Sequence, residues 1–451
     1  FRESKKKHII LITNHGCHSP VIEVTQDTGG QNFYVNDFAE ALLRLGYKVT
    51  ILNRGGYNHP VTGNMQKGIV YYDKEWGKKG MLCRIIYLED GAKEFIPKEK
   101  LTRDNLLKEK DFFMKKAKQI GLDLRKVCMI SSHYWDAGIL GILINDEIKK
   151  RFGKAKPHVW TCHSLGILKR SNYANAPEET IKALNFPYRI ENEEEVIEKA
   201  DGVVSTSQKI KNTIRKYDSR PKHHFWFPPG INIRKFKPRK IERCTNALKV
   251  LRDILGKTKK ETINLLWNNI IFLEISRTAK TKQKDMILRA FSKIRNDDKA
   301  ILIMNMDKKT EIYQKYIKIY NKLKNKDQVI LIQEFLSDEE MYELFSIANV
   351  YISASLMEGW GMSVQQGAAS QCAIISSRYV PFVVEVLKEN ALIVNKNYSR
   401  LYTEKIDIMI QEPHLRNRLA NEGQRIVSEE YSWKALSKRL IDDMKEKSLF
   451  R

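Results

Sequence analysis

Two histidines follow runs of β-forming residues in the N-terminal half of the sequence, and basic residues come soon after the second. His133 stands in "SSHYWDAG" and His163 in "TCHSLGILKR", where Lys169 and Arg170 follow. An imidazole at a strand end is either a structural residue with its own hydrogen-bond partners or a group that contacts substrate. Both alternatives stay open, because the two runs read as neighbouring strands that would bring the rings together.

Two cations follow another β-rich run in the C-terminal half. Arg277 and Lys282 stand in "SRTAKTKQKD", whose first two residues are the last two of the run "NIIFLEISR". A pair of fixed cations at that place could neutralise a diphosphate while its bond to a transferred group breaks. The alternative is a solvated run of charges, since lysine is common throughout the chain.

Glycine-rich turns supply the remaining candidates. Gly29, Gly30 and Gln31 precede a helical pattern, where bare backbone N–H groups and a helix N-terminus favour an anion. In "SASLMEGWGMSVQQGAASQ" the carboxylate of Glu358 stands before a second helical run, and the N–H groups of 359–362 follow it. The alternatives are an ordinary turn for the first segment and an N-cap for Glu358.

The order of the predicted elements gives the fold class. Strand and helix patterns alternate in both halves, which predicts two doubly wound, Rossmann-like parallel sheets facing each other across a cleft. "FWFPPGINIRKF" (225–236), rich in Pro and Gly, reads as the linker, and "CAIISS" (372–377) as the last strand. In open parallel sheets, ligands bind beyond the carboxyl ends of the strands, which is where all the candidates above are found.

Composition bounds the class of protein. The 451 residues are too many for one core, and no run of 18 apolar residues predicts a membrane span. Six scattered cysteines without a C-x-x-C pair favour a reduced, cytoplasmic protein. The formal charge of +25 is spread along the chain rather than gathered with aromatics, which argues against a nucleic-acid binder. It leaves attraction of an anionic substrate and a peripheral membrane contact open.

Six motifs in order resemble one family over nearly the whole chain. They are "DTGGQNFYVNDFAEALLRLGYKV", "SHYWDAG", "HSLGILK", "FPPGIN", "SRTAKTK" and "YSW" near Tyr431. Together they resemble the retaining, nucleotide-sugar-dependent family 4 glycosyltransferases of the GT-B fold, and most of all the sucrose-phosphate synthases. The resemblance implies an acceptor-binding domain over 1–230, a donor-binding domain over 231–430, and a C-terminal helix (431–451) that packs back on the N-terminal domain.

The resemblance also implies roles for residues. His163, Arg277, Lys282 and Glu358 correspond to the catalytic set. The donor nucleotide sugar is expected to contact Gly30, Gln31, Arg277, Lys282, Glu358, Gly361, Met362, Ser363 and Gln366. The acceptor is expected to contact Gln31, Lys98, His133, Ser164, Lys169 and Arg189, with the three cations around its phosphate. No metal and no cofactor are expected.

One position departs from the family pattern. The family has a second Glu eight positions after the first, and it binds the ribose hydroxyls of the nucleotide; here Gln366 stands there. An amide oxygen is a weaker acceptor than a carboxylate, and replacing a charged hydrogen bond by a neutral one costs about 1 kcal/mol, roughly fivefold in affinity. The change weakens the donor site without removing it, unless the chain is a pseudo-enzyme.

The expected function is transfer of a hexose, with glucose from UDP-glucose as first choice, to a phosphorylated sugar such as fructose 6-phosphate. Three alternatives stay open. The acceptor could be an inositol phosphate, as "SHYW" suggests, or a lipid or polysaccharide. The chain could also be a non-catalytic sensor of sugar nucleotides, which Gln366 favours and which the retained His163, Arg277, Lys282 and Glu358 oppose.

Overall fold

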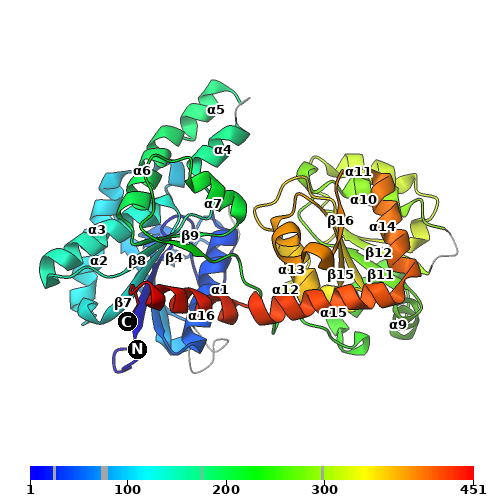
Figure 1. Cartoon of the computed structure of the whole chain (residues 1–451), viewed down its shortest axis with the longest axis horizontal. Helices are drawn as coiled ribbons and strands as arrows, with labels where there is room; N and C mark the ends of the chain where they lie inside the picture. Colours follow the sequence, from blue (N-terminus) through cyan, green and yellow to red (C-terminus); the bar gives the residue numbers. More distant parts are fainter. Residues whose placement is uncertain (24–26, 73–79, 174–175, 296–298, 451) are drawn as a thin grey trace. The chain divides into compact units, whose positions relative to one another are not determined.

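The computed structural model describes residues 1–23, 27–72, 80–173, 176–295 and 299–450 of the chain. It divides into two compact units. The N-terminal unit comprises Phe1–Gly230 together with Trp433–Arg451, and the C-terminal unit comprises Ile231–Ser432. Each unit contains a mainly or wholly parallel sheet with helices on both faces (Figure 1). The predicted fold class, two Rossmann-like α/β sheets, is confirmed.

The N-terminal unit is built on an eight-stranded sheet of order β10-β9-β8-β7-β1-β2-β6-β5. Its strands are β1 (His8–Ile12), β2 (Lys48–Gly55), β5 (Ile69–Tyr71), β6 (Cys83–Glu89), β7 (Val127–His133), β8 (His158–Thr161), β9 (Gly202–Ser205) and β10 (His224–Trp226). All pairs are parallel except β5 with β6, which is antiparallel. A small separate hairpin joins β3 (Tyr57–Asn58) to β4 (Met65–Gln66).

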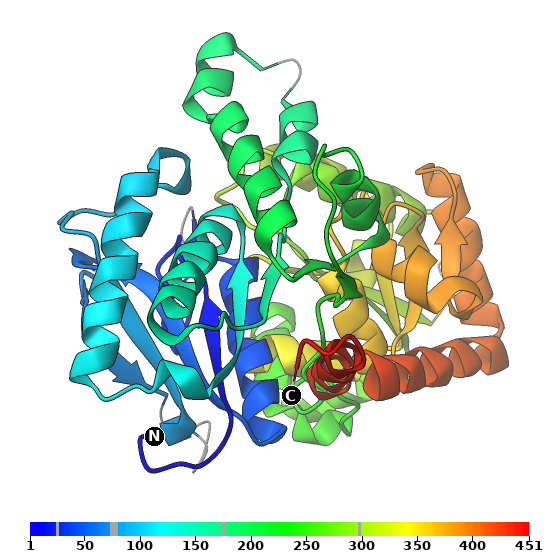
Figure 2. The same ribbon diagram turned by 60° about the vertical axis from the view of Figure 1, so that its left-hand side comes forward.

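Helices cover both faces of this sheet (Figure 2). They are α1 (Gly30–Arg44), α2 (Arg103–Gln119), α3 (Trp135–Phe152), α4 (Gly166–Asn172), α5 (Glu178–Ala183), α6 (Phe186–Lys199), α7 (Gln208–Ile214) and α16 (Trp433–Glu446), with the short turns η2 (Lys98–Lys100) and η3 (Leu124–Lys126). Side chains of alternate residues in β1 point to opposite faces of the sheet. Ile10 and Ile12 belong to the core shared with α2 and α3, while Ile9 and Leu11, also fully buried, point to the opposite face.

The last helix, α16, packs against α1, the first helix of the same unit (Figure 1). Trp433, at its start, places its ring 4.8 Å from that of Tyr34 and 6.0 Å from that of Phe227. The chain passes close beneath this ring at Gly230, where a Cβ would lie 2.6 Å from Cδ2 of Trp433. A residue with a side chain at position 230 would therefore displace the tryptophan.

The C-terminal unit repeats the plan on a six-stranded parallel sheet of order β13-β12-β11-β14-β15-β16. Its strands are β11 (Ile270–Glu274), β12 (Ala300–Asn305), β13 (Val329–Ile332), β14 (Val350–Ser353), β15 (Ala373–Ser377) and β16 (Leu392–Val394). The strand order reverses between β11 and β14, the two central neighbours. Loops that follow these two strands therefore lie at the topological switch point, where open α/β sheets bind ligands.

Helices again flank the sheet. They are α8 (Thr245–Leu255), α9 (Lys259–Trp267), α10 (Lys284–Phe291), α11 (Tyr313–Asn321), α12 (Asp338–Ile347), α13 (Met362–Ala369), α14 (Ser399–Gln411) and α15 (Pro413–Glu430), with the short turns η4 (Ile241–Arg243), η5 (Lys280–Lys282), η6 (Lys326–Gln328), η7 (Val383–Leu387) and η8 (Lys388–Asn390). Val350 and Ile352 join the core on the side of α10 and α14. Tyr351, between them, stacks on Phe345 of α12 and meets Gly367 of α13 on the other side.

The structure corrects three details of the sequence-based fold. The segment 225–236 is not wholly a linker, because Phe225 and Trp226 lie in the edge strand β10. The strand at 372–377 is not the last, because β16 follows it at the edge of the sheet. The N-terminal sheet is not purely parallel, since β5 adds an antiparallel edge next to β6, a strand that the sequence patterns did not reveal.

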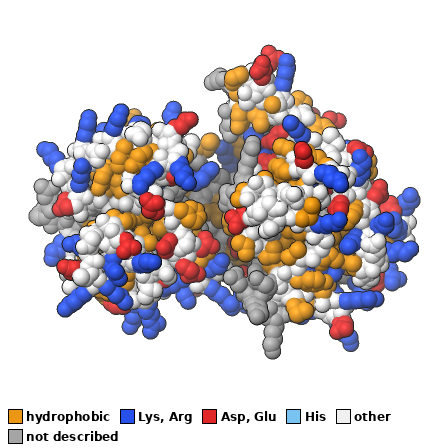
Figure 3. All heavy atoms as spheres, turned by 180° about the vertical axis from the view of Figure 1, so that it is seen from behind, with side chains coloured by type: hydrophobic (Ala, Val, Ile, Leu, Met, Phe, Trp, Pro, Cys, Tyr) orange, Lys and Arg blue, Asp and Glu red, His pale blue; other side chains and the backbone are white. Residues whose placement is uncertain are grey.

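Surface charge is distributed rather than concentrated on the face that Figure 3 shows. On the face seen in Figure 3, Lys and Arg side chains are scattered among acidic, apolar and polar ones in each unit. This agrees with the spread of basic residues along the sequence. Within the described residues, every helix is too short or too polar to span a lipid bilayer.

The packing of Trp433 gives the first testable prediction. The side chain is only 6 % exposed, so Trp433→Ala should remove about 3–5 kcal/mol from the unfolding free energy of the N-terminal unit. Trp267→Ala is the matched control, because Trp267 is 64 % exposed and should change stability by about 0.5 kcal/mol. Urea titrations measure both. Equal small effects would mean that α16 contributes little to this unit.

Candidate active site

Two histidines at the ends of adjacent strands meet in the N-terminal unit. His133 is the last residue of β7, and His163 lies just beyond the neighbouring β8. Nδ1 of His133 and Nε2 of His163 are 3.0 Å apart, so one ring donates a hydrogen bond and the other accepts it. Gln31, from the first turn of α1, donates to the carbonyl oxygen of His133 and to Thr13 Oγ1, each at 3.1 Å. Three predicted site residues are thus brought together.

Both imidazoles are neutral at physiological pH. Burial, followed by the charge of His15, lowers the pKa of His163 to about 3. Burial, followed by His163 and His18, holds the pKa of His133 well below its usual range. A neutral pair can orient a sugar hydroxyl through hydrogen bonds, but it cannot supply a positive charge. Any positive charge for an anionic ligand must therefore come from other residues.

The backbone around this pair is held in unusual conformations. His163 has φ 52° and Tyr134, which follows His133, has φ 82°. Non-glycine residues in this region are strained and persist only where the surroundings fix them. Tyr134 is fixed on several sides: its N–H donates to Thr161, its carbonyl accepts from Trp160 Nε1, and its ring lies 4.5 Å from that of His15. The strain places the Tyr134 ring beside a pocket.

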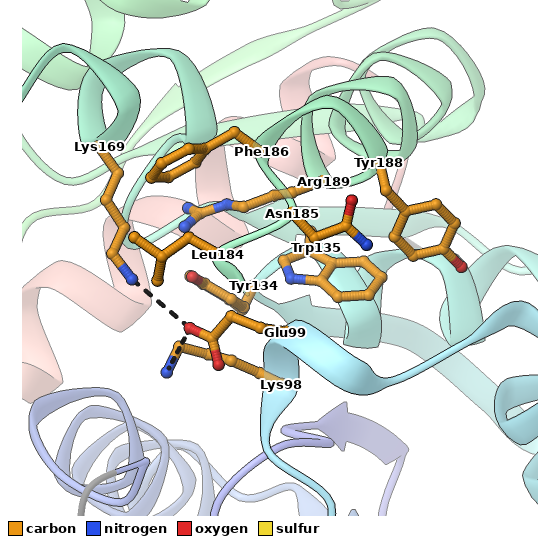
Figure 4. A pocket seen from close by; sticks show the side chains of 10 residues that line it. All are labelled: Lys98, Glu99, Tyr134, Trp135, Lys169, Leu184, Asn185, Phe186, Tyr188 and Arg189. Carbon is orange, nitrogen blue, oxygen red and sulfur yellow. Dashed lines mark ion pairs between the residues drawn. The ribbon is translucent and has the colours of Figure 1, made fainter. Parts of the chain in front are cut away.

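That pocket contains the three cations expected to bind the acceptor phosphate (Figure 4). Its lining residues are Lys98, Glu99, Tyr134, Trp135, Lys169, Leu184, Asn185, Phe186, Tyr188 and Arg189. Lys98 comes from η2, Lys169 from α4 and Arg189 from α6, so residues far apart in sequence converge. The guanidinium of Arg189 lies over the ring of Tyr134, 4.5 Å from its centre.

Carboxylates accompany all three cations. Lys98 forms an ion pair with Asp27, and Arg189 donates to Glu193 at 2.8 Å. Glu99 Oε1 lies 3.3 Å from Nζ of Lys98 and 3.6 Å from Nζ of Lys169. Burial, then Lys98 and Arg189, lower the pKa of Lys169, whereas Glu99 opposes that shift. The carboxylates thus help to keep a crowded group of cations charged.

Ser164, the remaining acceptor candidate, is linked to this pocket through Arg189. Nη2 of Arg189 donates to the carbonyl oxygen of Ser164 at 2.8 Å and to its Oγ at 3.4 Å. The loop after β8 therefore connects the histidine pair to the pocket of Lys98, Lys169 and Arg189. All six acceptor candidates lie in the N-terminal unit, where two clusters contain them.

Gly30 is the first residue of α1 and has open space beside it. Neither Gly29 nor Gly30 has a positive φ, and a Cβ at either would meet none of the described atoms within 4 Å. Neither packing nor backbone conformation therefore requires glycine there. Glycine at these positions would still allow a ligand to approach the first N–H groups of α1 closely.

In the C-terminal unit, two loops at the switch point bring Lys282 and Glu358 together. Lys282 ends η5 after β11, and Glu358 follows the adjacent β14. Their side chains form an ion pair, and Ser355 Oγ donates to Glu358 Oε1 at 2.9 Å. Arg277, nearer to the end of β11, is exposed. The ammonium group of Lys282, the carboxylate of Glu358 and the exposed side chain of Arg277 thus lie at the carboxyl ends of the two central strands.

Helix α13 begins at the same place. Gly361, its N-cap, has φ 107°, and a Cβ there would lie 2.2 Å from Cγ1 of Val380, so only glycine fits. Met362 and Ser363 form the first turn, whose N–H groups have no partner within the helix and attract negative charge. Gln366 is half-buried on the next turn, whereas Gln365 is fully buried and accepts a hydrogen bond from Trp360 Nε1 at 3.1 Å.

The sequence did not point to the partners of these groups. Asp27, Glu99, Glu193, Ser355, Tyr134 and Trp135 were not singled out. Asp27, Tyr134, Trp135 and Ser355 lie inside sequence motifs quoted above, and Glu99 lies between two lysines in "PKEK", but none of these patterns indicates a contact. Within the described part of the chain, no group of three or more His, Cys, Asp or Glu residues is placed to hold a metal ion.

Comparison with known proteins agrees with this arrangement. Residues 28–235 match the family model "Glycosyltransferase Family 4", and residues 257–426 match "Glycosyl transferases group 1". A mannosylfructose-phosphate synthase of Agrobacterium fabrum is 25 % identical over 376 residues, which cover 80 % of this chain and 74 % of the relative.

Solved structures show the same fold. A sucrose-phosphate synthase from Thermosynechococcus elongatus superposes with a TM-score of 0.68 at 22 % identity, covering 98 % of this chain and 99 % of the other. HepE of Anabaena, in complex with UDP and glucose, gives a TM-score of 0.61 at 13 % identity, with 98 % and 100 % covered. The fold is that of the GT-B glycosyltransferases. The chain belongs to the glycosyltransferases that join a family 4 domain to a group 1 domain.

The half-buried His163 predicts how stability depends on pH. The folded pKa of His163 is about 3, below its value of 6.5 in an unfolded chain. The unfolded state therefore binds more protons between these values, so the full stability is present above pH 6.5 and is lost as pH falls towards 3.

His163→Gln removes this contribution, so the loss of stability between pH 7 and pH 5 should shrink by about 2 kcal/mol. His414→Gln, at an exposed position on α15, is the control and should keep the wild-type slope. Urea midpoints measured from pH 5 to pH 7 test this. An unchanged slope in His163→Gln would contradict a lowered pKa of His163 in the folded state.

Proposed function

We propose that this chain is a retaining hexosyltransferase that moves a hexose from a nucleotide sugar to a phosphorylated sugar. UDP-glucose is the first choice of donor and fructose 6-phosphate of acceptor. The observation that carries the proposal is the convergence of Lys98, Lys169 and Arg189 on one pocket of the N-terminal unit. Three converging cations suit a phosphate group, whereas a neutral sugar or a lipid tail needs none.

The C-terminal unit supplies the chemistry expected for the donor. Lys282, Arg277 and the first N–H groups of α13 can neutralise the diphosphate as it leaves, without a metal ion. Glu358 can accept hydrogen bonds from hydroxyls of the donor sugar, beside the backbone of Gly361 and Met362. Lys282 already contacts Glu358, so the diphosphate and the sugar would share one cluster of polar groups.

The proposed transfer uses no enzymatic nucleophile. The acceptor hydroxyl forms a bond to the anomeric carbon while the bond from that carbon to the diphosphate oxygen breaks. The proton of the hydroxyl passes to an oxygen of the departing phosphate, and attack from the same face retains the configuration. The neutral His163 and His133 orient sugar hydroxyls by hydrogen bonds during this step.

The comparisons support the class of acceptor and of donor. The Agrobacterium relative and the Thermosynechococcus structure are each named for the synthesis of a phosphorylated disaccharide. The Anabaena structure contains UDP and glucose. The first name includes a mannosyl group, so GDP-mannose belongs in the donor panel beside UDP-glucose.

Activity assays test the proposal directly. The protein is incubated with UDP-glucose and fructose 6-phosphate, released UDP is quantified, and the product anomer is determined by NMR. Parallel reactions contain EDTA, GDP-mannose as donor, and inositol phosphate or unphosphorylated fructose as acceptor. We expect turnover with a sugar phosphate, retention of configuration and no effect of EDTA. Absence of turnover with every nucleotide sugar would instead favour a non-catalytic sensor.

The acceptor pocket predicts a selective defect. Lys169→Gln removes one charge-assisted contact to the phosphate, worth about 1.5–3 kcal/mol, so the KM for the phosphorylated acceptor should rise about 10- to 100-fold. UDP binding, measured by calorimetry, should not change. Lys182→Gln is the control, since Lys182 is exposed on α5 and pairs with Glu178. If Lys169→Gln instead loses UDP binding, Lys169 contributes to the donor site rather than to the acceptor site.

Gln366 predicts a gain of affinity. Gln366→Glu places a carboxylate on the second turn of α13, where it can accept from both ribose hydroxyls and where the helix N-terminus favours negative charge. The Kd for UDP should fall about fivefold. The neighbouring Gln365→Glu is the contrast, because Gln365 is buried against Trp360. An unchanged Kd for UDP in Gln366→Glu would mean that residue 366 does not contact the ribose.

A further inference from the structure

The phosphate pocket is electrically neutral before any ligand binds. Lys98, Lys169 and Arg189 line it together with Glu99, while Asp27 and Glu193 pair with Lys98 and Arg189 from outside the lining, so the formal charges of these six groups cancel. A dianionic phosphate would add two negative charges to this group. One of the carboxylates must therefore leave if the ligand is to meet a positive site.

Two of the three carboxylates are fixed by other contacts. Asp27 is 8 % exposed, and its second oxygen accepts the backbone N–H of Lys98 at 3.1 Å. Glu193 is fully buried and accepts the N–H of Gly166 at 2.8 Å and 3.1 Å, and also the hydroxyl of Tyr217. Removing either from its place would leave backbone or hydroxyl donors buried without a partner.

Glu99 is held differently. Its contacts in the described structure are to the two ammonium groups, which share its Oε1 at 3.3 Å and 3.6 Å. It lies on the single turn η2, and its side chain is 19 % exposed. In Figure 4 the two dashed ion pairs converge on this carboxylate, between Lys98 and Lys169. A carboxylate oxygen shared by two ammonium groups occupies the position that a phosphate oxygen would take.

The space in the pocket supports displacement. The cavity volume is about 10 Å³, which is room for about one water molecule. A phosphate group needs more room than one water molecule, and movement of the Glu99 side chain would provide it. Glu99 can move towards solvent with the loss of two ion pairs, which the phosphate then replaces.

We propose that Glu99 is an internal counter-ion that occupies the anion position between Lys98 and Lys169, and that an incoming phosphate displaces it. This rests on the proposed function, because it concerns the pocket assigned there to the acceptor phosphate. Displacement requires a ligand that offers more negative charge than the carboxylate that leaves. Glu99 therefore acts as a specificity-determining residue, which favours a dianionic phosphate over a neutral sugar.

Binding of inorganic phosphate and of fructose 6-phosphate to the full chain tests the inference, with no nucleotide sugar present. Calorimetry on Glu99→Gln should give a Kd about tenfold lower than wild type for both ligands, because the internal competitor is gone. Glu99→Ala should shift the Kd in the same direction, and thermal unfolding verifies that both variants are folded. Lys169→Gln should lose most of the binding.

Glu195→Gln is the matched control. Glu195 is 20 % exposed and is also shared by two cations, Arg103 at 2.6 Å and Lys199 at 2.9 Å, but it does not line the pocket. The Kd of the Glu195→Gln variant for phosphate should equal that of the wild type. Weaker or unchanged phosphate binding in Glu99→Gln would overturn the inference. Failure of both the wild type and the variant to bind phosphate, when both are folded, would also overturn it.

The outcome is independent of catalysis. If no nucleotide sugar supports turnover but Glu99→Gln still tightens phosphate binding, the proposed transferase function fails and the counter-ion role of Glu99 stands. If turnover occurs with fructose 6-phosphate but Glu99→Gln binds phosphate more weakly, the transferase function stands. Glu99 then serves to position the two lysines, and the inference fails.

Discussion

Partly buried cations cannot remain without a counter-charge, and this constraint organises both halves of the molecule. Lys98 and Lys169 share Glu99, Arg189 pairs with Glu193, and Lys282 pairs with Glu358. Each candidate site thus has a carboxylate of its own unit in contact with a cation that we propose to bind a phosphate. If the proposed function holds, binding of a phosphorylated ligand is an exchange of counter-ions rather than entry into a site of net positive charge. Such an exchange would make the affinity depend on the charge of the ligand.

The sheets place these groups where the exchange can occur. The central strands of each unit run parallel, so their carboxyl ends, and the loops that follow, lie at one edge. In the N-terminal unit this edge carries His133 and His163, whose neutral rings form a hydrogen-bonded pair. In the C-terminal unit it carries the loop of Lys282 and the start of α13. The histidines contribute shape and hydrogen bonds, while the lysines and arginines contribute charge.

The sequence predicted those parts that local pattern determines. Alternating strand and helix patterns were enough for the fold class, and strand ends were enough to bring His133 towards His163. The short edge strands β5 and β16 were missed because three residues carry too little periodicity to distinguish a strand from a loop. The resemblance to a family supplied Lys98, Lys169 and Arg189. Their assigned roles stay predictions.

Counter-ions were beyond the reach of sequence patterns. Asp27 contacts Lys98 from 71 positions away, and Glu358 contacts Lys282 from 76 positions away. The spacing of residues in the sequence does not indicate such a contact, because only the folded structure brings the two segments together. The left-handed backbone of Tyr134, which turns its ring beneath Arg189, is likewise set by tertiary contacts rather than by local preference.

A crystal structure with UDP and fructose 6-phosphate bound tests the exchange of counter-ions most directly. The account predicts that the acceptor phosphate lies between the ammonium groups of Lys98 and Lys169, with the Glu99 carboxylate turned towards solvent, and that the UDP diphosphate contacts Lys282. A sugar phosphate bound elsewhere, with Glu99 still between the two lysines, would contradict it.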